Sequence, residues 1–236
     1  MTFVTHHSCT VGARGHLRRQ VARMRLRKIS GAVVRRLPLY LRVLEDATRD
    51  GDKELMSSQE LGERAGVSPA LVRKDLAWFG EFGKQGVGYD VNTLKTELRR
   101  ILHLDRDIPI ALVGVGSLGH ALARYFRRRY LSDPGFHLNI VALFDADPEK
   151  QGETIEGLQV ESPDMIEVRT RELGLRMGII AVPAESAQDV VDRCVAAGIR
   201  LLLNFAPVKL TVPEGVHLVN ADVSLELQRL AYYLRD

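Results

Sequence analysis

The sequence predicts an α/β protein with two domains, an N-terminal winged helix-turn-helix followed by a doubly wound parallel sheet. Three observations support this prediction. Short amphipathic segments fill residues 31–79 and lead into a stretch with four glycines at 80–89. The run IPIALVG at 108–114 is continuously apolar, which is typical of a parallel strand buried on both faces. After it, apolar runs alternate with helical patterns, as in a sheet covered by helices on both sides.

The composition is that of a globular protein. Hydrophobic residues make up 45% and charged residues 27% of the 236 residues, enough to bury a core. No run approaches the roughly 18 apolar residues of a membrane span, and the N-terminus lacks the apolar segment of a secretory signal. Cys9 and Cys194 lie far apart and outside any Cys/His cluster, which argues against a disulfide framework or a metal site and fits a reducing cytoplasm.

Charge is distributed unevenly along the chain. Residues 1–106 contain 20 Lys and Arg against 12 Asp and Glu, whereas residues 107–236 contain 13 against 18. A basic front half suggests a nucleic acid partner, although an uneven solvated surface without functional meaning gives the same count. Residues 1–29 have seven basic and no acidic residues, which predicts a disordered basic arm. This arm either touches DNA phosphates or reflects an upstream start codon chosen in error, with Met24, just before the ordered pattern, as the true start.

The first domain, predicted over 30–106, begins with a helix that ends near residue 50 and has apolar residues at three- and four-residue steps. The motif SSQE at 57–60 has capping-box spacing, with Ser57 as N-cap of a short helix that Gly66 ends. Ser68 and Pro69 are the N-cap and first residue of a third helix over 70–79. The glycine-rich segment 80–89 reads as a wing, and 92–104 as a fourth amphipathic helix.

A short helix, a glycine turn and a helix capped by Ser-Pro predict a DNA-binding helix-turn-helix. The first residues of such a recognition helix approach base edges. Arg73 suits a bidentate contact with guanine, and Lys74 suits a phosphate. An αα-hairpin with an ordinary basic face is the alternative. The predicted DNA contacts are Ser57, Ser68, Pro69, Ala70, Arg73, Lys74, Lys84, Gln85 and Tyr89.

The second domain, predicted over 107–223, starts with the strand at 108–114. The pattern then predicts helices at 119–129, 164–172 and 185–197 and strands at 138–144, 178–182, 201–205 and 216–220. A last helix at 224–234, within a C-terminal segment 224–236, has an apolar stripe that requires a partner surface. The predicted boundary between the two domains lies at 105–109.

Residues 114–119, GVGSLG, form a G-x-G-x-x-G motif between the first strand and a helix, which predicts a Rossmann-like dinucleotide site. Gly114 permits the tight turn, Gly116 lets a pyrophosphate approach the backbone, and Gly119 lets the helix pack closely. Asp145, at the end of the next strand, is placed to accept from the adenosine ribose and favours NAD(H) over NADP(H). A nucleotide-free domain, or one for S-adenosylmethionine or coenzyme A, is the alternative.

The sequence favours a sensor over an enzyme. Only about one nucleotide fold follows the glycine motif, and no nucleophile elbow, metal triad or Lys/Tyr pair stands out. His120, His137 and His217 are isolated. The residues leave two other hypotheses open, a small NAD-dependent oxidoreductase and a DNA-binding regulator that senses coenzyme A or another nucleotide.

Five segments together resemble Rex, the redox-sensing transcriptional repressor family of bacteria. They are RLPLYLRVLE (36–45), SSQELGERAGVSPALVRKDLAWFGEFGKQGVGY (57–89), LVGVGSLGHALARY (112–125), FDADPEKQG (144–152) and LNFAPVKL (203–210). The resemblance covers residues 30–236. It implies a cytoplasmic homodimer that binds a palindromic operator in double-stranded DNA and is released by NADH, with NADH and NAD⁺ acting as effectors and no metal, membrane or catalysis involved.

The resemblance also implies site residues and a C-terminal helix, 224–234, that the two subunits exchange. Arg42, Tyr125 and Asp222 correspond to a redox switch, in which Arg42 can pair with Asp222. Two positions depart from the family pattern: Ser117 replaces an Arg or Asn found beside the pyrophosphate, and Gln85 replaces a basic wing residue. The implied cofactor contacts are Gly114, Val115, Gly116, Ser117, Leu118, Gly119, Asp145, Asp147, Lys150, Val182, Pro183, Asn204, Phe205, Ala206 and Pro207.

Overall fold

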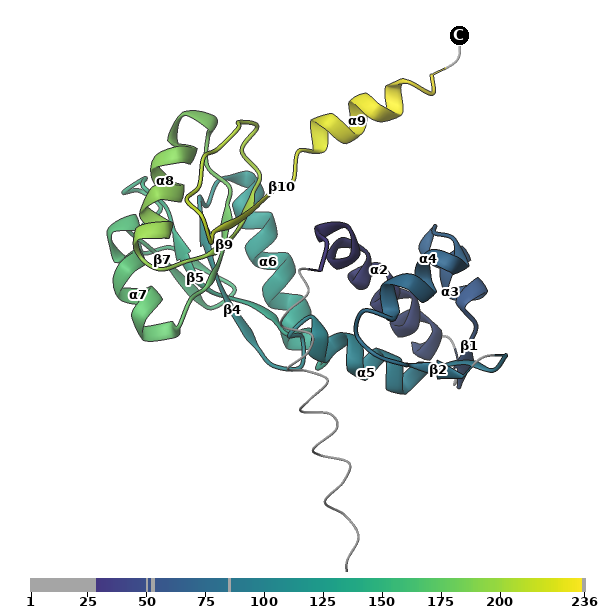
Figure 1. The fold of residues 1–236 in the computed structure, drawn as a ribbon. Coiled ribbons are helices and arrows are strands. Elements are labelled where there is room, and N and C mark those ends of the chain that lie inside the picture. The colour runs from purple at the N-terminus through teal and green to yellow at the C-terminus, as the bar shows by residue number, and fades with distance from the viewer. Residues whose placement is uncertain (1–28, 50, 52–53, 85, 235–236) are drawn as a thin grey trace, which may run out of the picture. The chain divides into compact units, whose positions relative to one another are not determined.

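The computed structural model describes residues 29–49, 51, 54–84 and 86–234 (Figure 1). The predicted arm at 1–29 therefore lies outside the described residues except for Ile29, and so does Gln85. The chain divides into two compact units, residues 1–105 and 106–236. Among the described residues, no helix combines the length and apolar character that crossing a bilayer demands.

In its described residues, from Ile29 onwards, the N-terminal unit has four helices and a small antiparallel sheet. The sheet has the order β1-β3-β2, and its last two strands form the wing. The helices are α2 (Gly31–Arg49), α3 (Ser58–Ala65), α4 (Pro69–Leu76) and α5 (Val91–Ile101), and the strands are β1 (Leu55–Met56), β2 (Gly83–Lys84) and β3 (Gly88–Asp90).

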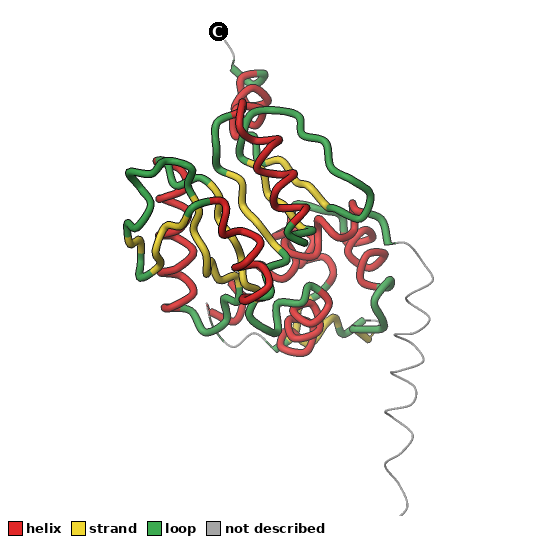
Figure 2. Tube along the Cα trace, turned by 90° about the vertical axis from the view of Figure 1, so that its left-hand side faces the viewer, coloured by secondary structure: helices red, strands yellow, loops and turns green. Residues whose placement is uncertain are grey.

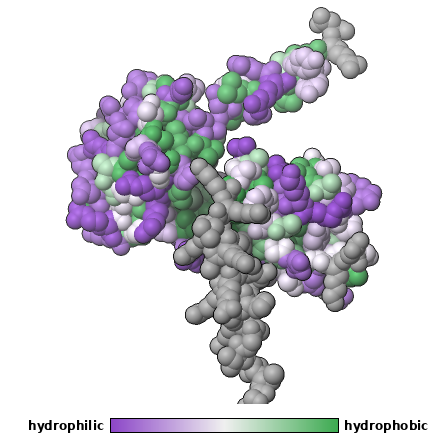
Figure 3. Space-filling view, in the orientation of Figure 1, coloured by the Kyte–Doolittle hydropathy of each residue, from purple (hydrophilic) through white to green (hydrophobic). Residues whose placement is uncertain are grey.

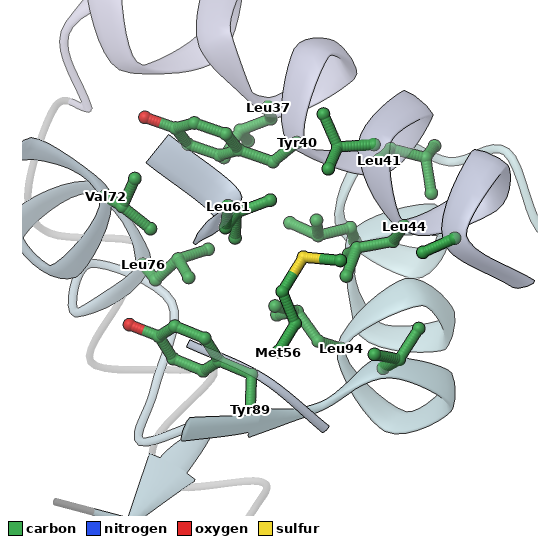
Figure 4. Packing of buried hydrophobic residues seen from close by; sticks show 14 of the residues in the cluster. Leu37, Tyr40, Leu41, Leu44, Met56, Leu61, Val72, Leu76, Tyr89 and Leu94 are labelled. Carbon is green, nitrogen blue, oxygen red and sulfur yellow. The ribbon is translucent and has the colours of Figure 1, made fainter. Parts of the chain in front are cut away.

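The apolar stripes of these helices converge on one core (Figure 4). Each helix contributes residues at the three- and four-residue spacing that puts side chains on one helical face. Tyr40 is the largest fully buried side chain, and Met56 comes from β1. Figure 4 shows side chains from α2, α3, α4 and α5 meeting there, including Leu37, Tyr40, Leu41, Leu44, Leu61, Val72, Leu76 and Leu94.

The predicted caps are present, but the recognition helix is shorter than predicted. The Ser57 and Ser68 hydroxyls accept hydrogen bonds from the N–H groups of residues 60 and 71, at 3.1 and 3.3 Å. The third helix was expected over 70–79, whereas α4 ends at Leu76. The N–H groups of Trp78 and Phe79 bond to the carbonyls three residues earlier, so the last turn tightens before the wing.

The second unit is a doubly wound sheet with the order β10-β9-β8-β4-β5-β7-β6, in which every pairing is parallel except β6 with β7. The order reverses beside β4, which makes the carboxyl ends of β4 and β8 the switch point of the sheet. The strands are β4 (Ile108–Val113), β5 (Leu138–Phe144), β6 (Thr154–Ile155), β7 (Leu158–Glu161), β8 (Met177–Ile180), β9 (Leu201–Asn204) and β10 (His217–Asn220).

Helices cover both faces of this sheet (Figures 1 and 2). Helix α6 (Ser117–Ser132) packs on one face around Leu112, Ala123 and Ile140. The other face, with Phe144 and Val191, is covered by η1 (Pro163–Met165), α7 (Ile166–Leu173) and α8 (Ala184–Ala196). Alternate residues of β4 point to opposite faces, so its continuous apolar run supplies both cores.

Two features of this unit differ from the sequence analysis. The hairpin β6–β7 was not predicted, although its strand β7 pairs in parallel with β5 and so belongs to the main sheet. The last helix, α9 (Val223–Ala231), begins one residue earlier than predicted and ends three residues before Leu234. No residue of α9 is buried in the described part of the chain, and Figure 3 shows polar and apolar side chains interspersed along it.

Candidate DNA-binding and dinucleotide sites

A groove lies in the N-terminal unit where the first turns of α3 and α4 face the wing. Ser57, Ser58 and Gln59 line it from α3, Pro69 and Arg73 from α4, and residues 83 and 86–89 from the wing. The positive ends of the α3 and α4 helix dipoles lie at this surface, which suits phosphate oxygens. The groove therefore joins the two elements that a winged helix-turn-helix applies to DNA.

Arg73 is exposed on the outer face of α4, and its Nη1 donates to the Ser58 hydroxyl at 2.8 Å. Lys74 and Ala70 are exposed on the same helix, and Pro69 is half-buried at its first turn. The structure thus brings the predicted recognition residues together on one accessible surface. Arg73 is pre-positioned by a hydrogen bond, which lowers the entropy lost when a guanidinium is immobilised against a base.

Tyr89 differs from the other predicted contacts, because only 8% of it is exposed and it belongs to the core. Burial raises the pKa of its hydroxyl, with a smaller opposing influence from Arg73. Tyr89 therefore lines the groove and belongs to the hydrophobic core at the same time. Lys84 lies on β2 in the wing, and its side chain lies outside the described residues.

Sequence reasoning missed a buried charge network behind the recognition helix. The Asp75 carboxylate on α4 accepts from Nε and Nη2 of Arg36 at 2.6 and 2.8 Å and from the Tyr40 hydroxyl at 2.8 Å. Asp75 is 1% exposed. A signal was available: Asp75 falls on the apolar stripe of α4, three residues after Val72, and an acidic residue at a core position predicts a buried partner.

The glycine-rich loop of the second unit has the geometry of a dinucleotide site. Gly114 follows β4 with φ +95°, a conformation that favours glycine. A Cβ at Gly119 would lie 1.8 Å from the Gly114 carbonyl oxygen, whereas one at Gly116 would meet no atom within 4 Å. Gly119 therefore permits close packing of α6, and Gly116 leaves open space through which a ligand can approach the backbone.

Gly116 is also the N-cap of α6, and within the described residues no side chain caps this helix end. Ser117 and Leu118 are exposed in its first turn. The N–H groups there are available to an anion, and the helix dipole favours one. Because the serine at 117 has a short neutral side chain, we expect backbone N–H groups rather than a cation to make the phosphate contacts at this point.

Asp145 follows β5 and lies against the glycine loop. One carboxylate oxygen accepts from the Val115 N–H at 2.7 Å and lies 3.3 Å from Lys150 Nζ, and the other accepts from the Asp147 N–H at 2.9 Å. Burial opposes the charge, but these hydrogen bonds outweigh it and the pKa of Asp145 is lowered. The carboxylate is thus ionised and held against the loop, and part of its hydrogen-bonding capacity is used within the chain.

The other predicted cofactor residues follow the neighbouring strands. Val182 and Pro183 come after β8, and Pro183 is the N-cap of α8. Asn204 is fully buried at the end of β9, where its amide accepts from the Ala206 N–H at 2.9 Å and donates to the Ala206 carbonyl and to Asn220. It fixes the loop of residues 205–207, Phe205, Ala206 and Pro207. Carboxyl ends of parallel strands form one edge, so all these loops share it.

The three predicted switch residues have distinct settings in their own units. Arg42 is exposed on α2. Tyr125 is 53% exposed on α6, and its hydroxyl accepts from Arg129 at 2.8 Å. Asp222 is the N-cap of α9, accepting from the N–H groups of residues 224 and 225 at 2.9 and 3.3 Å. In the described part of the chain, no three His, Cys, Asp or Glu side chains come together as metal ligands.

Two family models match the chain in the order of its two units. A "putative DNA-binding protein N-terminus" matches residues 28–77, and a "CoA binding domain" matches residues 105–208. The redox-sensing transcriptional repressor Rex of Roseiflexus is 46% identical over 212 residues, which are 89% of this chain and 93% of the relative. Rex of Chloroflexus aurantiacus is 48% identical over 86% of this chain and 92% of the relative.

The chain belongs to the Rex family. Rex of Streptomyces coelicolor is a further relative, 46% identical over 89% of this chain and 79% of its own length. Membership confirms the predicted class, a redox-sensing transcriptional repressor rather than an enzyme, and with it the winged helix-turn-helix and Rossmann-like fold.

Solved structures of a Rex-family repressor, RSP, cover the same range. RSP in complex with β-NAD⁺ and operator DNA is 37% identical, has a TM-score of 0.79, and covers 87% of this chain and 92% of its own. RSP in complex with β-NADH is 35% identical, has a TM-score of 0.75, and covers 87% of this chain and 94% of its own. The match therefore extends through both units rather than resting on the nucleotide fold alone.

Proposed function

We propose that this cytoplasmic chain represses transcription as a homodimer on an inverted-repeat operator and leaves the DNA when NADH binds. One observation carries the proposal. A DNA-facing groove and an open glycine loop occur in a single chain that aligns with an RSP structure holding both NAD⁺ and operator DNA. Sensing then requires that NADH and NAD⁺ have different affinities for the DNA-bound and free states.

In this proposal the dinucleotide lies across the switch point of the sheet. Its pyrophosphate takes the N–H groups at the start of α6, where Gly116 leaves room. The adenosine ribose lies beside Asp145, whose ionised carboxylate repels a 2′-phosphate and so selects NAD(H) over NADP(H). The nicotinamide extends towards Val182, Pro183 and the Asn204 loop. The bound dinucleotide supplies a charge that reduction removes, because oxidised nicotinamide is cationic and NADH is neutral there.

In this scheme, the protein responds to the charge of the nicotinamide ring. Asp222 at the start of α9 attracts a cationic ring more than a neutral one. When the ring is neutral, Asp222 is free to pair with Arg42 of the DNA-binding unit. The ring charge is thereby coupled to how that unit docks, and a coupling of about 1–3 kcal/mol is usual for such switches.

The homodimer rests on α9. Its apolar residues are exposed in the single chain, with Leu227 at 61% and Leu230 at 63%. A row of exposed leucines on one helix is typical of a protein interface. We expect the full chain to have the mass of a dimer by light scattering and a chain ending at Asp222 to have that of a monomer.

The function is tested by fluorescence anisotropy on an inverted-repeat duplex at one fixed salt concentration, since phosphate contacts make the affinity depend on ionic strength. We expect tight binding that NADH abolishes and excess NAD⁺ restores. Coenzyme A is the second candidate effector, because one matching family model carries its name. Release by coenzyme A with no response to NADH would replace the proposal, and turnover of NADH would point to an oxidoreductase.

A further inference from the structure

The network behind the recognition helix takes no part in the function as proposed so far. Asp75 on α4 receives three hydrogen bonds, two from the Arg36 guanidinium and one from the Tyr40 hydroxyl, at 2.6 to 2.8 Å. Both partners lie on α2, four residues apart and therefore on one helical face. The Asp75 side chain is 1% exposed and that of Arg36 21%. Figure 4 shows Tyr40 crossing the core, with its hydroxyl on the side where Val72 of α4 lies.

The network acts on the helix that carries the recognition residues. Helix α4 has only eight residues, so few contacts determine its rotation and tilt. Successive residues are about 100° apart around a helix, so Asp75 faces α2 while Arg73 and Lys74 face outwards, as their exposure shows. A bidentate pair fixes angle as well as distance, because two parallel N–H···O bonds define a plane.

Stability alone does not explain such a network. Desolvation of a buried ion pair generally offsets its attraction, and apolar residues of similar volume often replace one without loss of stability. Apolar contacts, in contrast, allow a short helix to rotate or slide, since they have no preferred direction. A network of directional hydrogen bonds at this place therefore defines an orientation.

We propose that Arg36 and Tyr40 are positioning residues that, through Asp75, set the angle at which the recognition helix presents Arg73 to the bases. The network then governs discrimination between operator and other DNA, and contributes little to phosphate attraction or to folding. This inference rests on the proposed DNA binding and adds the residues that determine its specificity.

The protonation states support a permanent anchor rather than a switch. Burial opposes the charge on Asp75, but hydrogen bonds from Arg36 and Tyr40 outweigh it and lower the pKa of the carboxyl group. Burial and the neighbouring carboxylate raise the pKa of Tyr40 to about 12. The pKa of Arg36 is raised by its hydrogen bonds to Asp75. All three groups therefore keep one protonation state across the neutral range.

The test compares a triple variant with a double variant. Arg36→Met and Tyr40→Phe with Asp75→Leu remove the network and leave neither an unpaired charge nor an unpaired buried hydroxyl. The matched control, Glu45→Leu with Arg99→Met, removes the 2.6 Å ion pair that joins the same helix α2 to α5 and does not touch α4. The probes are a duplex selected by the wild-type chain from a randomised pool and a shuffled duplex of equal length, with NADH fluorescence reporting the intact second unit.

We expect the network variant to lose ten-fold or more in affinity for the selected duplex, with less than two-fold change on the shuffled duplex and an unchanged salt slope. The control variant should still prefer the selected duplex over the shuffled one as the wild type does, even if its Tm falls by as much as that of the network variant. The inference would be overturned if the network variant preferred the selected duplex as strongly as the wild type does. It would also be overturned if both variants lost the same affinity for the selected duplex. If the network variant fails to fold, the single variant Tyr40→Phe provides the test. We expect it to lose two- to five-fold in affinity for the selected duplex, and no loss would contradict the inference. A wild-type chain that selects no duplex would reject the proposed function itself.

Discussion

Gly116 and Gly119 occupy one motif but meet different physical demands. A Cβ at Gly119 would overlap the Gly114 carbonyl oxygen at 1.8 Å, while one at Gly116 would enter open space. Gly119→Ala should therefore destabilise the second unit by about 1–3 kcal/mol through overpacking. Gly116→Ala should leave the melting temperature unchanged and weaken NADH binding, because its methyl group enters the ligand's path.

These two variants are best measured side by side, by thermal melting and by NADH fluorescence titration. Each serves as the control for the other, since the substitution is the same and only its place differs. A Gly116→Ala chain that binds NADH as tightly as the wild type would move the pyrophosphate away from the start of α6. A stable Gly119→Ala chain would contradict the packing described for this loop.

Asp145 should make the second unit sensitive to acid. Its pKa in the folded chain is lowered from 3.8, so its contribution to stability is present above that value and is lost as pH falls through the lowered pKa. We expect the free energy of unfolding of the wild type to approach that of Asp145→Asn below about pH 4. Urea unfolding between pH 6 and pH 3 measures this, and a difference that stays constant with pH would contradict it.

Some side-chain roles followed from sequence because they are local. Ser57 and Ser68 cap helices through hydrogen bonds to N–H groups three residues ahead, so spacing alone identifies them. A contact of Asp145 was missed, since its carboxylate also accepts from the loop N–H of Val115, thirty residues away. The Asp75 network joins residues 35 to 39 positions apart, and such pairing depends on how two helices pack, which periodicity does not report.

At the scale of elements, strong local patterns were predicted and weak ones were missed. Helix α6 and strand β5 were close to prediction because each has a strong period or a continuous apolar run. The hairpin β6–β7 was missed, since its turn is Glu156-Gly157 rather than the familiar Asn-Gly. Both turn residues have positive φ, at 47° and 81°, as a two-residue hairpin turn of this type requires.

The recognition helix should separate specificity from affinity. Arg73→Ala is expected to cost about 1–3 kcal/mol on an operator and to relax the base preference at one position. Lys74→Ala should weaken binding to all sequences alike and reduce the salt slope by about one, because it removes a phosphate contact. Anisotropy titrations on matched and mutated duplexes at several salt concentrations distinguish the two. A uniform loss for Arg73→Ala would assign it to phosphate.

At the scale of the whole molecule, the two units are stabilised by separate cores but serve one function. Each has its own core, so each can fold around its own apolar residues. The sequence motifs predicted both candidate sites, because a helix-turn-helix and a glycine loop are local in sequence. Coupling between them is a property of states rather than of motifs, and it depends on a ligand whose charge differs by one unit between its two redox forms.

Asp222 is where this coupling is most directly tested. Its carboxylate also caps α9, so Asp222→Ala would remove a charge and a helix cap together. Asp222→Asn separates these effects, since asparagine is an equally good N-cap and carries no charge. We expect Asp222→Asn to dimerise and to bind the operator, but to lose most of the NADH-induced release in anisotropy titrations. If NADH still releases this variant as it does the wild type, ring charge is not read at Asp222, and the switch must lie elsewhere.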